Sequence, residues 1–331
     1  MTGTEDPRPS RVFIVGGAGF IGSHFVDRLL SEGATESVTV FDNFSSGREE
    51  HLAPNAADRR LRIVRGDAAD LEHLVDSMGG SGTVIHLASN PDIARAVTEP
   101  SIDFDAGTLL THHVVEAMRR SGARHILYAS GSGVYGDLGE VEADEDHGPL
   151  CPVSTYGASK LAGEALISAY CHMFGLTGCV FRFGNVVGPR QTHGVGYDFV
   201  RRLTEEPDRL NILGDGKQSK SYVHVSDVVE AVLLASKAAP RPLATYNVAT
   251  GDYITVAEIA DLAVRAVGLD PGRTDFEFAG GDRGWSGDVP VVRLNTDRIR
   301  RLGWANAMST AQAMDASLAA MVEELRSGRL R

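Results

Sequence analysis

Residues 12–22 read Val12-Phe13-Ile14-Val15-Gly16-Gly17-Ala18-Gly19-Phe20-Ile21-Gly22, an apolar run followed directly by spaced glycines. We expect 11–17 to form a strand buried on both faces and 21–31 to form the helix that follows it. Glycines at G-x-x-G-x-x-G spacing let the backbone turn tightly and approach a pyrophosphate, which the helix N-terminus attracts. A turn that needs glycine only for packing has the same spacing, but its place in the first strand–helix unit favours a dinucleotide site.

Further short, β-branched runs recur with helical segments between them, at 37–42, 61–67, 83–88, 125–130 and 178–184. This alternation predicts an α/β fold with a doubly wound parallel sheet. After Gly184 the pattern weakens and a smaller mixed α/β lobe is expected. We therefore predict a dinucleotide-binding domain at 1–184, on which 221–250 packs back, and a second lobe made of 185–220 and 251–331. Pro240-Arg241-Pro242 is interpreted as a turn.

The composition excludes several classes of partner. The chain has 331 residues and a net charge of −12, without a basic run, which argues against nucleic acid and anionic membranes. No apolar run reaches the roughly 18 residues of a membrane helix. Cys151, Cys171 and Cys179 lack CxxC spacing, and His112 and His113 point about 100° apart on a helix, so neither a disulfide framework nor a metal site is predicted. A cytoplasmic location is expected.

Asp42 ends the second expected strand, 26 residues after Gly16. A carboxylate at this place can accept hydrogen bonds from the ribose hydroxyls of an adenosine and repels a 2′-phosphate, so NAD is favoured over NADP. The alternative is that Asp42-Asn43 only forms a turn.

Five further motifs complete a recognisable set: Asp42-Asn43, Gly66-Asp67, His86-Leu87-Ala88, Val134-Tyr135-Gly136 and Tyr156-Gly157-Ala158-Ser159-Lys160. With the glycine turn, they resemble the extended short-chain dehydrogenase/reductases, the NAD-dependent epimerase/dehydratase family with a Rossmann-type fold. Within this family the chain is most similar to UDP-glucose 4-epimerases of the archaeal kind, through 156–171, 214–216 and 281–289.

The resemblance implies two sets of contacts. NAD would be held by Gly16, Gly19, Phe20, Ile21, Gly22, Asp42, Asn43, Gly47, Asp67, Ala68, Leu87, Ala88, Ser89, Tyr156, Lys160 and Phe183. A nucleotide-sugar substrate would be contacted by Asn185, Val195, Lys220, Tyr222 and Arg283, of which the two cations suit a diphosphate.

Tyr156 and Lys160 stand at i and i+4 and therefore share one face of a helix. An ammonium beside a phenol favours the phenolate, so we expect Lys160 to lower the pKa of Tyr156 towards neutrality. Tyr156 would then act as a base on a sugar hydroxyl while hydride leaves the same carbon for NAD. The resemblance also implies that Lys160 holds the nicotinamide ribose.

Two positions depart from the family. The family places a Ser or Thr that bonds the reacting hydroxyl three residues before the Val of Val-Tyr-Gly, and this chain has Gly131 there. Ser130 and Ser132 flank it and are the candidate substitutes, although neighbouring strand side chains point to opposite faces. The helical Asn of the family is replaced within Ala106-Gly107-Thr108.

The family's sugar 4,6-dehydratases carry Asp-Glu just before Val-Tyr-Gly, and its UDP-glucuronate decarboxylases carry a Glu there. This chain has Ser132-Gly133, so elimination and decarboxylation are disfavoured. The expected reaction is NAD-dependent C4 epimerisation of a UDP-hexose. The alternatives are another nucleotide-sugar oxidoreductase or epimerase, and a non-catalytic binder of NAD or a sugar nucleotide. Helices at 107–119 and 156–172 correspond to the family's dimer bundle, so a homodimer is expected.

Overall fold

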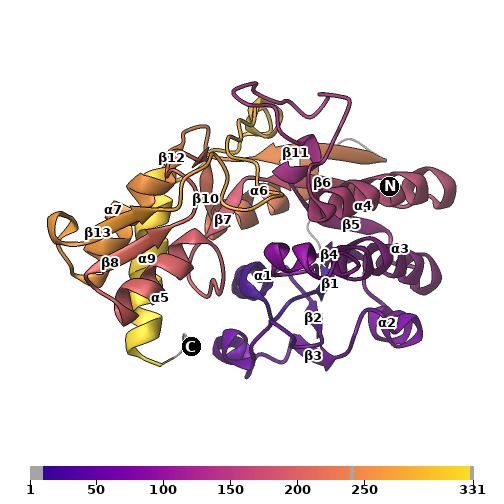
Figure 1. Ribbon diagram of the computed structural model, residues 1–331. Coiled ribbons are helices and arrows are strands. Elements are labelled where there is room, and N and C mark those ends of the chain that lie inside the picture. The colour runs from indigo at the N-terminus through magenta and orange to yellow at the C-terminus, as the bar shows by residue number, and fades with distance from the viewer. Residues whose placement is uncertain (1–9, 239–241, 329–331) are drawn as a thin grey trace.

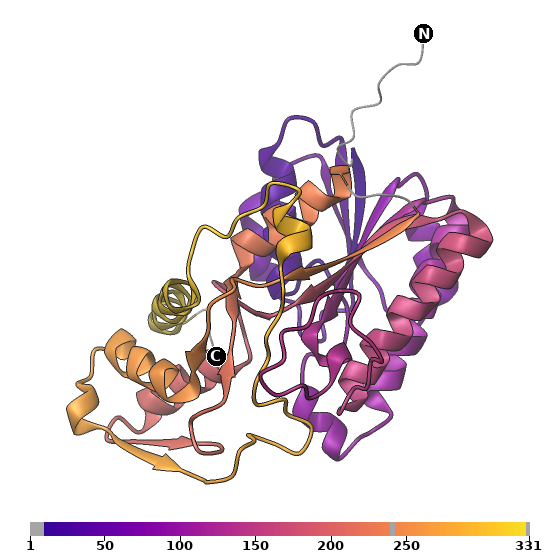
Figure 2. The same cartoon turned by 90° about the horizontal axis from the view of Figure 1, so that it is seen from above.

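The computed structural model describes residues 10–238 and 242–328. The chain forms two lobes (Figures 1 and 2). The predicted turn at Pro240-Arg241-Pro242 lies, apart from Pro242, outside the described residues. No helix in the described part of the chain is long and apolar enough to cross a membrane. The same residues contain no group of three or more His, Cys, Asp or Glu side chains placed to hold a metal.

A seven-stranded parallel sheet forms the first lobe, which confirms the predicted fold class. The strand order reverses between β1 and β4, and ligands of such sheets bind at the carboxyl ends of the strands beside this point. In spatial order the strands are β11 (Leu243–Val248), β6 (Thr177–Phe183), β5 (His125–Gly131), β4 (Thr83–His86), β1 (Arg11–Val15), β2 (Ser37–Asp42) and β3 (Leu61–Arg65).

Helices cover both faces of the sheet because apolar side chains alternate between two cores. On one face α1 (Phe20–Ser31) and α6 (Val225–Ala238) bury residues such as Phe25 and Val228. On the other face lie α2 (Leu71–Met78), α3 (Leu110–Ser121) and α4 (Thr155–Phe174), which bury residues such as Met78, Val114 and Ile167 (Figure 1).

The second lobe packs three helices around its own apolar core: α5 (Val195–Glu205), α7 (Val256–Val267) and α9 (Thr310–Arg326). A capping box of Thr255 and Glu258 fixes the start of α7. The remaining strands pair as β7 (Asn185–Val187) with β10 (Tyr222–His224), β8 (Arg209–Ile212) with β13 (Asp275–Phe278), and β9 (Ser219–Lys220) with β12 (Ile254–Thr255).

The helix expected at 107–119 begins differently from the expectation. The π-helix η4 (Phe104–Leu109) precedes α3, and Gly107 lies within it against α4, where a Cβ would stand 2.6 Å from the Ser159 hydroxyl oxygen. Single-turn π-bulges are frequent at functional sites. Shorter helices are η1 (Glu49–His51), η2 (Ala53–Asn55), η3 (Ile93–Val97), η5 (Ser132–Tyr135), η6 (Pro271–Arg273) and α8 (Asp297–Arg300).

Candidate active site

The glycine turn leaves no room for side chains. A Cβ on Gly16, whose φ is +84°, would stand 2.8 Å from the Ala88 nitrogen, and a Cβ on Gly22 would stand 2.3 Å from the Gly16 oxygen. Gly19 caps α1, and no side chain satisfies or neutralises the first turn of that helix. This turn therefore fits the pyrophosphate of a dinucleotide, because the bare N-terminus attracts an anion and the backbone is open to close approach.

The other expected cofactor residues gather at the same edge of the sheet. They stand where parallel strands end: Asp42, Asn43 and Gly47 after β2, Asp67 and Ala68 after β3, Leu87, Ala88 and Ser89 after β4, and Phe183 at the end of β6. The amides of Leu87 and Ala88 both donate to the Val15 carbonyl at 3.0 Å, which locks β4 onto the start of the turn. Phe20 and Ile21 open α1.

Asp42 holds the loops around this edge. Its carboxylate is 8% exposed and accepts hydrogen bonds from the amides of Ala18 at 2.9 Å and Phe44 at 2.8 Å. Gly47 is needed beside it, because a Cβ there would approach an Asp42 oxygen to 2.9 Å. Each carboxylate oxygen keeps a lone pair for a ribose hydroxyl. Asp42 thus fits both of its sequence interpretations, the turn and the ribose contact.

We predict that Asp42→Asn weakens NAD binding and narrows the preference for NAD over NADP. The amide oxygen still serves one of the two backbone donors, while the negative charge that repels a 2′-phosphate is lost. Fluorescence titration with both reduced cofactors measures the ratio of dissociation constants. Asn43→Ala serves as the control, because it leaves the Asp42 charge in place. An unchanged ratio in Asp42→Asn would contradict the assignment.

Tyr156 and Lys160 lie in the first turns of α4, whose N-terminus is capped by Ser154. The Lys160 ammonium is buried and donates to the Ala129 carbonyl at 2.8 Å, and it stands 5.5 Å from the centre of the Tyr156 ring. The two side chains therefore share a helix face next to β5. Burial lowers the pKa of Lys160 to about 8, against the opposing effects of Asp103 and Glu164.

The expected direction of the Tyr156 pKa is wrong for this structure. Burial raises the pKa of Tyr156 to about 12, a hydrogen bond with Ser89 acts in the opposite direction, and the charge of Asp103 raises it further. Desolvation of the phenolate is the largest of these effects, and the Lys160 ammonium donates to the Ala129 carbonyl and not to the phenol. In this structure Tyr156 therefore carries its proton at neutral pH.

Ser130 is the weaker of the two serine candidates. Its hydroxyl is buried and donates to Glu164 at 2.5 Å, so it faces the interior of the first lobe. Glu164 in turn forms a buried ion pair with Arg182, at 2.7 Å and 3.1 Å. Ser132 begins η5 and is partly exposed, lining a small cavity beside Tyr135 and Leu294. The Ser130 side chain lies on the face of β5 toward α4, which carries Glu164.

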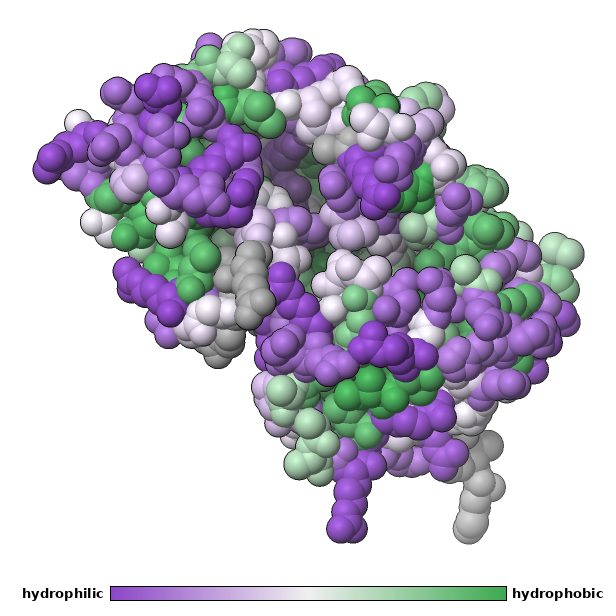
Figure 3. All heavy atoms as spheres, turned by 60° about the horizontal axis from the view of Figure 1, so that its bottom comes forward, coloured by the Kyte–Doolittle hydropathy of each residue, from purple (hydrophilic) through white to green (hydrophobic). Residues whose placement is uncertain are grey.

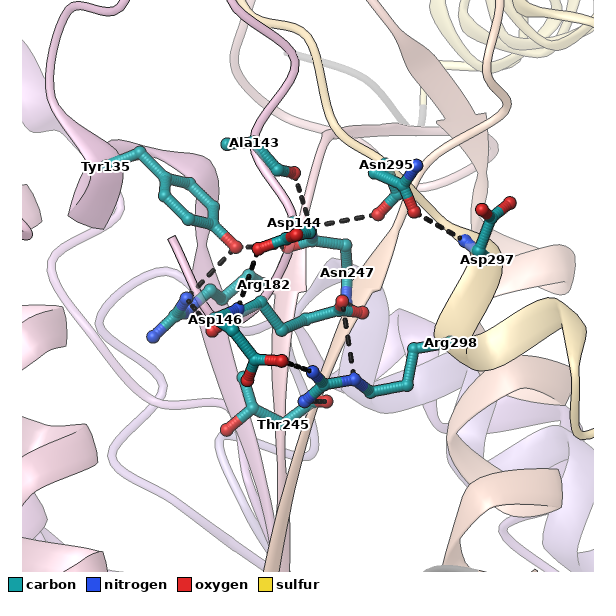
Figure 4. A network of polar contacts seen from close by, with 11 residues as sticks. Tyr135, Ala143, Asp144, Asp146, Arg182, Thr245, Asn247, Asn295, Asp297 and Arg298 are labelled. Carbon is teal, nitrogen blue, oxygen red and sulfur yellow. Dashed lines mark hydrogen bonds and ion pairs between the residues drawn. The ribbon is translucent and has the colours of Figure 1, made fainter. Parts of the chain in front are cut away.

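A polar network extends from Arg182 on β6 to the neighbouring edge strand β11 (Figure 4). Arg182 donates to the Tyr135 hydroxyl at 3.0 Å, and Tyr135 donates to Asn247 on β11 at 2.8 Å. Asn247 also bonds the Ala143 and Asn295 carbonyls, at 2.9 Å each. Through Asn247, the network joins the Val-Tyr-Gly motif to the loop after it, at Ala143, and to the C-terminal segment, at Asn295. These hydrogen bonds fix the three segments relative to one another.

Backbone strain does not explain Gly131. Its φ is −157°, an extended conformation that any residue adopts, and a Cβ there would have no heavy atom within 4 Å. A hydroxyl-bearing side chain therefore fits at this position. The space around the Cβ position of residue 131, where the family carries its Ser or Thr, is therefore open.

The two cations expected to bind a diphosphate form ion pairs with carboxylates of the chain. Lys220 pairs with Asp288 at 2.6 Å, and Arg283 pairs with Asp137 at 2.5 Å and donates to the Asp288 carbonyl. The Arg283 pair joins the late glycine-rich loop to the loop that follows Val-Tyr-Gly. Figure 3 shows a hollow between the two lobes. A diphosphate would have to compete with these carboxylates for both cations.

The other expected substrate residues are placed unevenly. Asn185 is exposed at the start of β7, with its amide 3.4 Å from the Ser221 carbonyl, and Val195 begins α5 with partial exposure. Tyr222 is only 7% exposed and packs in the apolar core of the second lobe, where burial raises its pKa. This packing favours a structural role for the Tyr222 ring.

Sequence reasoning missed several charged residues around the site. Glu164 was detectable, because it stands four residues after Lys160 and so on the same helix face. Asp288 lies inside a motif already noticed, Gly281 to Val289, but nothing in the spacing pairs it with Lys220. Asp103 carries no local signal at all, since only the fold brings it to the start of α4.

The model of the NAD dependent epimerase/dehydratase family matches residues 12–249. The chain belongs to the NAD-dependent epimerase/dehydratase family. It is 33% identical over 312 residues to a UDP-glucose 4-epimerase of Mycolicibacterium smegmatis, covering 92% of this chain and 96% of that protein. It is also 34% identical over 292 residues to a dTDP-glucose 4,6-dehydratase of an Actinoplanes species, covering 85% and 90%.

A solved relative carries the cofactor. The structure of Thermus thermophilus UDP-glucose 4-epimerase in complex with NAD matches with a TM-score of 0.81 and 31% identity, covering 94% of this chain and 98% of that one. Family membership and the fit of the glycine turn make this chain an NAD-dependent enzyme of the nucleotide-sugar epimerase/dehydratase class. Relatives with either activity are similarly identical to this chain, so sequence identity does not distinguish between the two reactions.

Proposed function

We propose that the protein catalyses C4 epimerisation of a UDP-hexose, interconverting UDP-glucose and UDP-galactose. One observation supports it most: Tyr156 and Lys160 are set for proton transfer beside an NAD site, while Ser132 and Gly133 offer no carboxyl group. Dehydration needs an acid for the departing hydroxyl and a base for the proton at C5, and the family's decarboxylases also carry a carboxyl group at this position. Oxidation followed by reduction requires only the pair that is present.

In the proposed reaction, Tyr156 takes the proton of the 4-hydroxyl and later returns it to the 4-keto sugar. NAD, held by the glycine turn and the strand ends beside it, would supply the acceptor and donor of the C4 hydride. Lys160 holds positive charge beside the phenol, and Ser89 donates or accepts at the phenol oxygen. No net oxidation occurs, so the cofactor can stay bound between turnovers.

Incubation with UDP-galactose and NAD, followed by chromatography of the sugar nucleotides, tests the proposal. We expect UDP-glucose to appear and dTDP-glucose to be recovered without loss of water. Formation of a 4-keto-6-deoxy sugar from dTDP-glucose would instead identify a dehydratase. Absence of turnover with all common UDP-, dTDP- and GDP-sugars would overturn the enzymatic function and leave a binding protein.

A second candidate is an epimerase or oxidoreductase for a bulkier nucleotide sugar. The open space at Gly131 supports it, because removing a side chain from this wall makes room for a larger or differently turned sugar. Loss of a catalytic hydroxyl usually accompanies a change of substrate or reaction. This candidate uses the same Tyr156 and Lys160 and differs only in substrate.

Gly131→Thr separates these two candidates: an enzyme for the bulkier sugar should lose turnover on its true substrate and keep its NAD affinity. A Cβ at this position has no heavy atom within 4 Å, so we expect the fold to tolerate the side chain and its effect to fall on the sugar. For an ordinary UDP-glucose epimerase the regained hydrogen bond would instead raise kcat, by on the order of tenfold. Steady-state kinetics with UDP-galactose decides, and Gly82→Thr, at an open position without a positive φ, measures the cost of a threonine elsewhere.

The assembly and location are also proposals. The homodimer would bury the outer surface formed by η4, α3 and α4, where Phe104 is 58% exposed and Met173 is 71% exposed. Apolar side chains at this level of exposure suit a partner helix pair. Sedimentation showing only monomer at micromolar concentration would contradict it. A cytoplasmic location is proposed on the three free cysteines, of which Cys171 and Cys179 are buried.

A further inference from the structure

Asp103 is a buried carboxylate next to the catalytic helix. It is 1% exposed and immediately precedes η4. Its two oxygens accept hydrogen bonds from the Asn90 side-chain amide at 2.8 Å and from the Thr155 hydroxyl at 2.7 Å. Thr155 is the first residue of α4 and the neighbour of Tyr156. Asp103 therefore joins the segment after β4, η4 and the start of the catalytic helix.

The charge of Asp103 has no direct partner. Both hydrogen-bond donors are neutral, and within the described residues Asp103 forms no ion pair. Glu164, the other buried carboxylate on this side of α4, is neutralised by Arg182 in a two-pronged contact. Carboxylates are almost never fully buried without a compensating charge. A cation is therefore required near Asp103.

Lys160 is a buried cation whose pKa the charge of Asp103 raises. Lys160 is 3% exposed, and within the described residues its ammonium donates a hydrogen bond only to the neutral Ala129 carbonyl. The titratable groups facing it are His86 from β4, Tyr128 from β5 at 5.3 Å from ring centre to ammonium, Tyr156 and Glu164 from α4, and Asp103. Burial and Lys160 together lower the pKa of His86 to about 3, so this histidine is neutral. Of the two carboxylates, only Asp103 lacks a cation of its own.

We propose that Asp103 is the counter-charge of Lys160 and a positioning residue for Tyr156. Its carboxylate keeps the ammonium charged in the interior of the site, and its bond to Thr155 fixes the turn on which Tyr156 stands. The inference rests on the roles proposed above for Tyr156 and Lys160. The structure agrees with it electrostatically, since Asp103 comes first among the charges that raise the pKa of Lys160.

Asp103→Asn isolates the charge, because the asparagine oxygen can still accept from Asn90 while its amide donates to the Thr155 hydroxyl. Loss of the negative charge lowers the pKa of both Lys160 and Tyr156, so both limbs of the pH profile of turnover move to lower pH. For Lys160 we expect a shift of about one pH unit or more, the usual effect of an opposite charge at this range. Thr155→Val keeps the charge, so its profile stays in place while kcat falls.

The chain offers a direct readout that does not depend on turnover, since its only lysines are Lys160, Lys217, Lys220 and Lys237. In protein labelled with ¹³C-lysine, NMR follows each Cε signal through a pH titration, and Lys160→Arg identifies the signal of Lys160. We expect its midpoint, about 8 in the unmutated protein, to fall in Asp103→Asn. Asp105→Asn is the matched control, because it removes an exposed carboxylate two residues away and should leave Lys160 unchanged.

An unchanged Lys160 midpoint in folded Asp103→Asn overturns the proposal. If that variant does not fold, the double variant Asp103→Asn/Lys160→Met carries the test, because it removes both charges of the proposed pair. We then expect the double variant to unfold at higher urea concentration than either single variant that can be measured. Losses of stability that simply add would reject the charge pair.

The two proposals fail separately. If the NMR shift appears but the unmutated protein turns over no nucleotide sugar, the charge pair stands and the epimerase function falls. If the protein epimerises UDP-galactose and Lys160 titrates identically in both forms, the function stands and the role of Asp103 falls.

Discussion

Tyr156→Phe lowers nucleotide-sugar turnover by about a hundredfold or more and leaves NAD binding nearly unchanged. The phenol oxygen is the group placed to move the 4-hydroxyl proton, and general acid–base groups typically contribute on the order of 10²–10⁴ in rate. The ring remains, so packing at the start of α4 is preserved. Turnover is measured by chromatography, and bound NAD by extraction and absorbance.

Tyr170→Phe is the matched control, because it removes a phenol from the far end of the same helix, where the hydroxyl contacts Glu116 at 3.2 Å. Its turnover should stay within about twofold of that of the unmutated protein. A larger fall would measure the general cost of removing a tyrosine hydroxyl from α4. If Tyr156→Phe retained turnover comparable to Tyr170→Phe, the proton would have to move through another group.

Glu164→Ala should lower the free energy of unfolding by about 3–5 kcal/mol, because it leaves a buried guanidinium without its carboxylate. Arg182 is 5% exposed, and its remaining partners, Tyr135 and the Glu145 carbonyl, are neutral. The Ser130 hydroxyl would also lose its acceptor. Urea unfolding followed by circular dichroism gives the difference.

Glu230→Ala provides the comparison on the surface. Glu230 pairs with Arg28, and the two side chains are 52% and 33% exposed, so screening by water limits the expected loss to about 1 kcal/mol. Equal losses in Glu164→Ala and Glu230→Ala would show that the buried pair is compensated in some other way. The double replacement Glu164→Leu/Arg182→Met should recover part of the loss, since it removes both buried charges.

The local sequence pattern was sufficient to predict the parallel sheet and the helix that carries Tyr156 and Lys160. Continuous apolar runs such as 12–15 can only be satisfied between two layers of helices, and Tyr156 and Lys160 are adjacent in space by helical spacing alone. The same reasoning could not orient Ser130, because strand alternation says only that it opposes its neighbours and not which face holds Glu164.

The electrostatic environments of the site residues could not be predicted from the spacing of residues in the sequence. The raised pKa of Tyr156 depends on how deeply the phenol is buried and on Asp103, which stands 53 residues earlier in the chain. The partners of Lys220 and Arg283, Asp288 and Asp137, stand 68 and 146 residues away from them in the chain. These contacts are long-range in sequence, and no helical or strand period encodes them.

The position of β11 and α6 limits how the protein can be divided. A fragment ending at residue 184 would expose the outer edge of β6 and remove Val228 and Val232, together with Ile299 and Trp304 from near the C-terminus, out of one face of the core. Exposed edges and uncovered apolar faces lead to aggregation. Expression of the first lobe alone should therefore yield insoluble material, and labelling or crystallographic work on its cofactor site needs the entire chain.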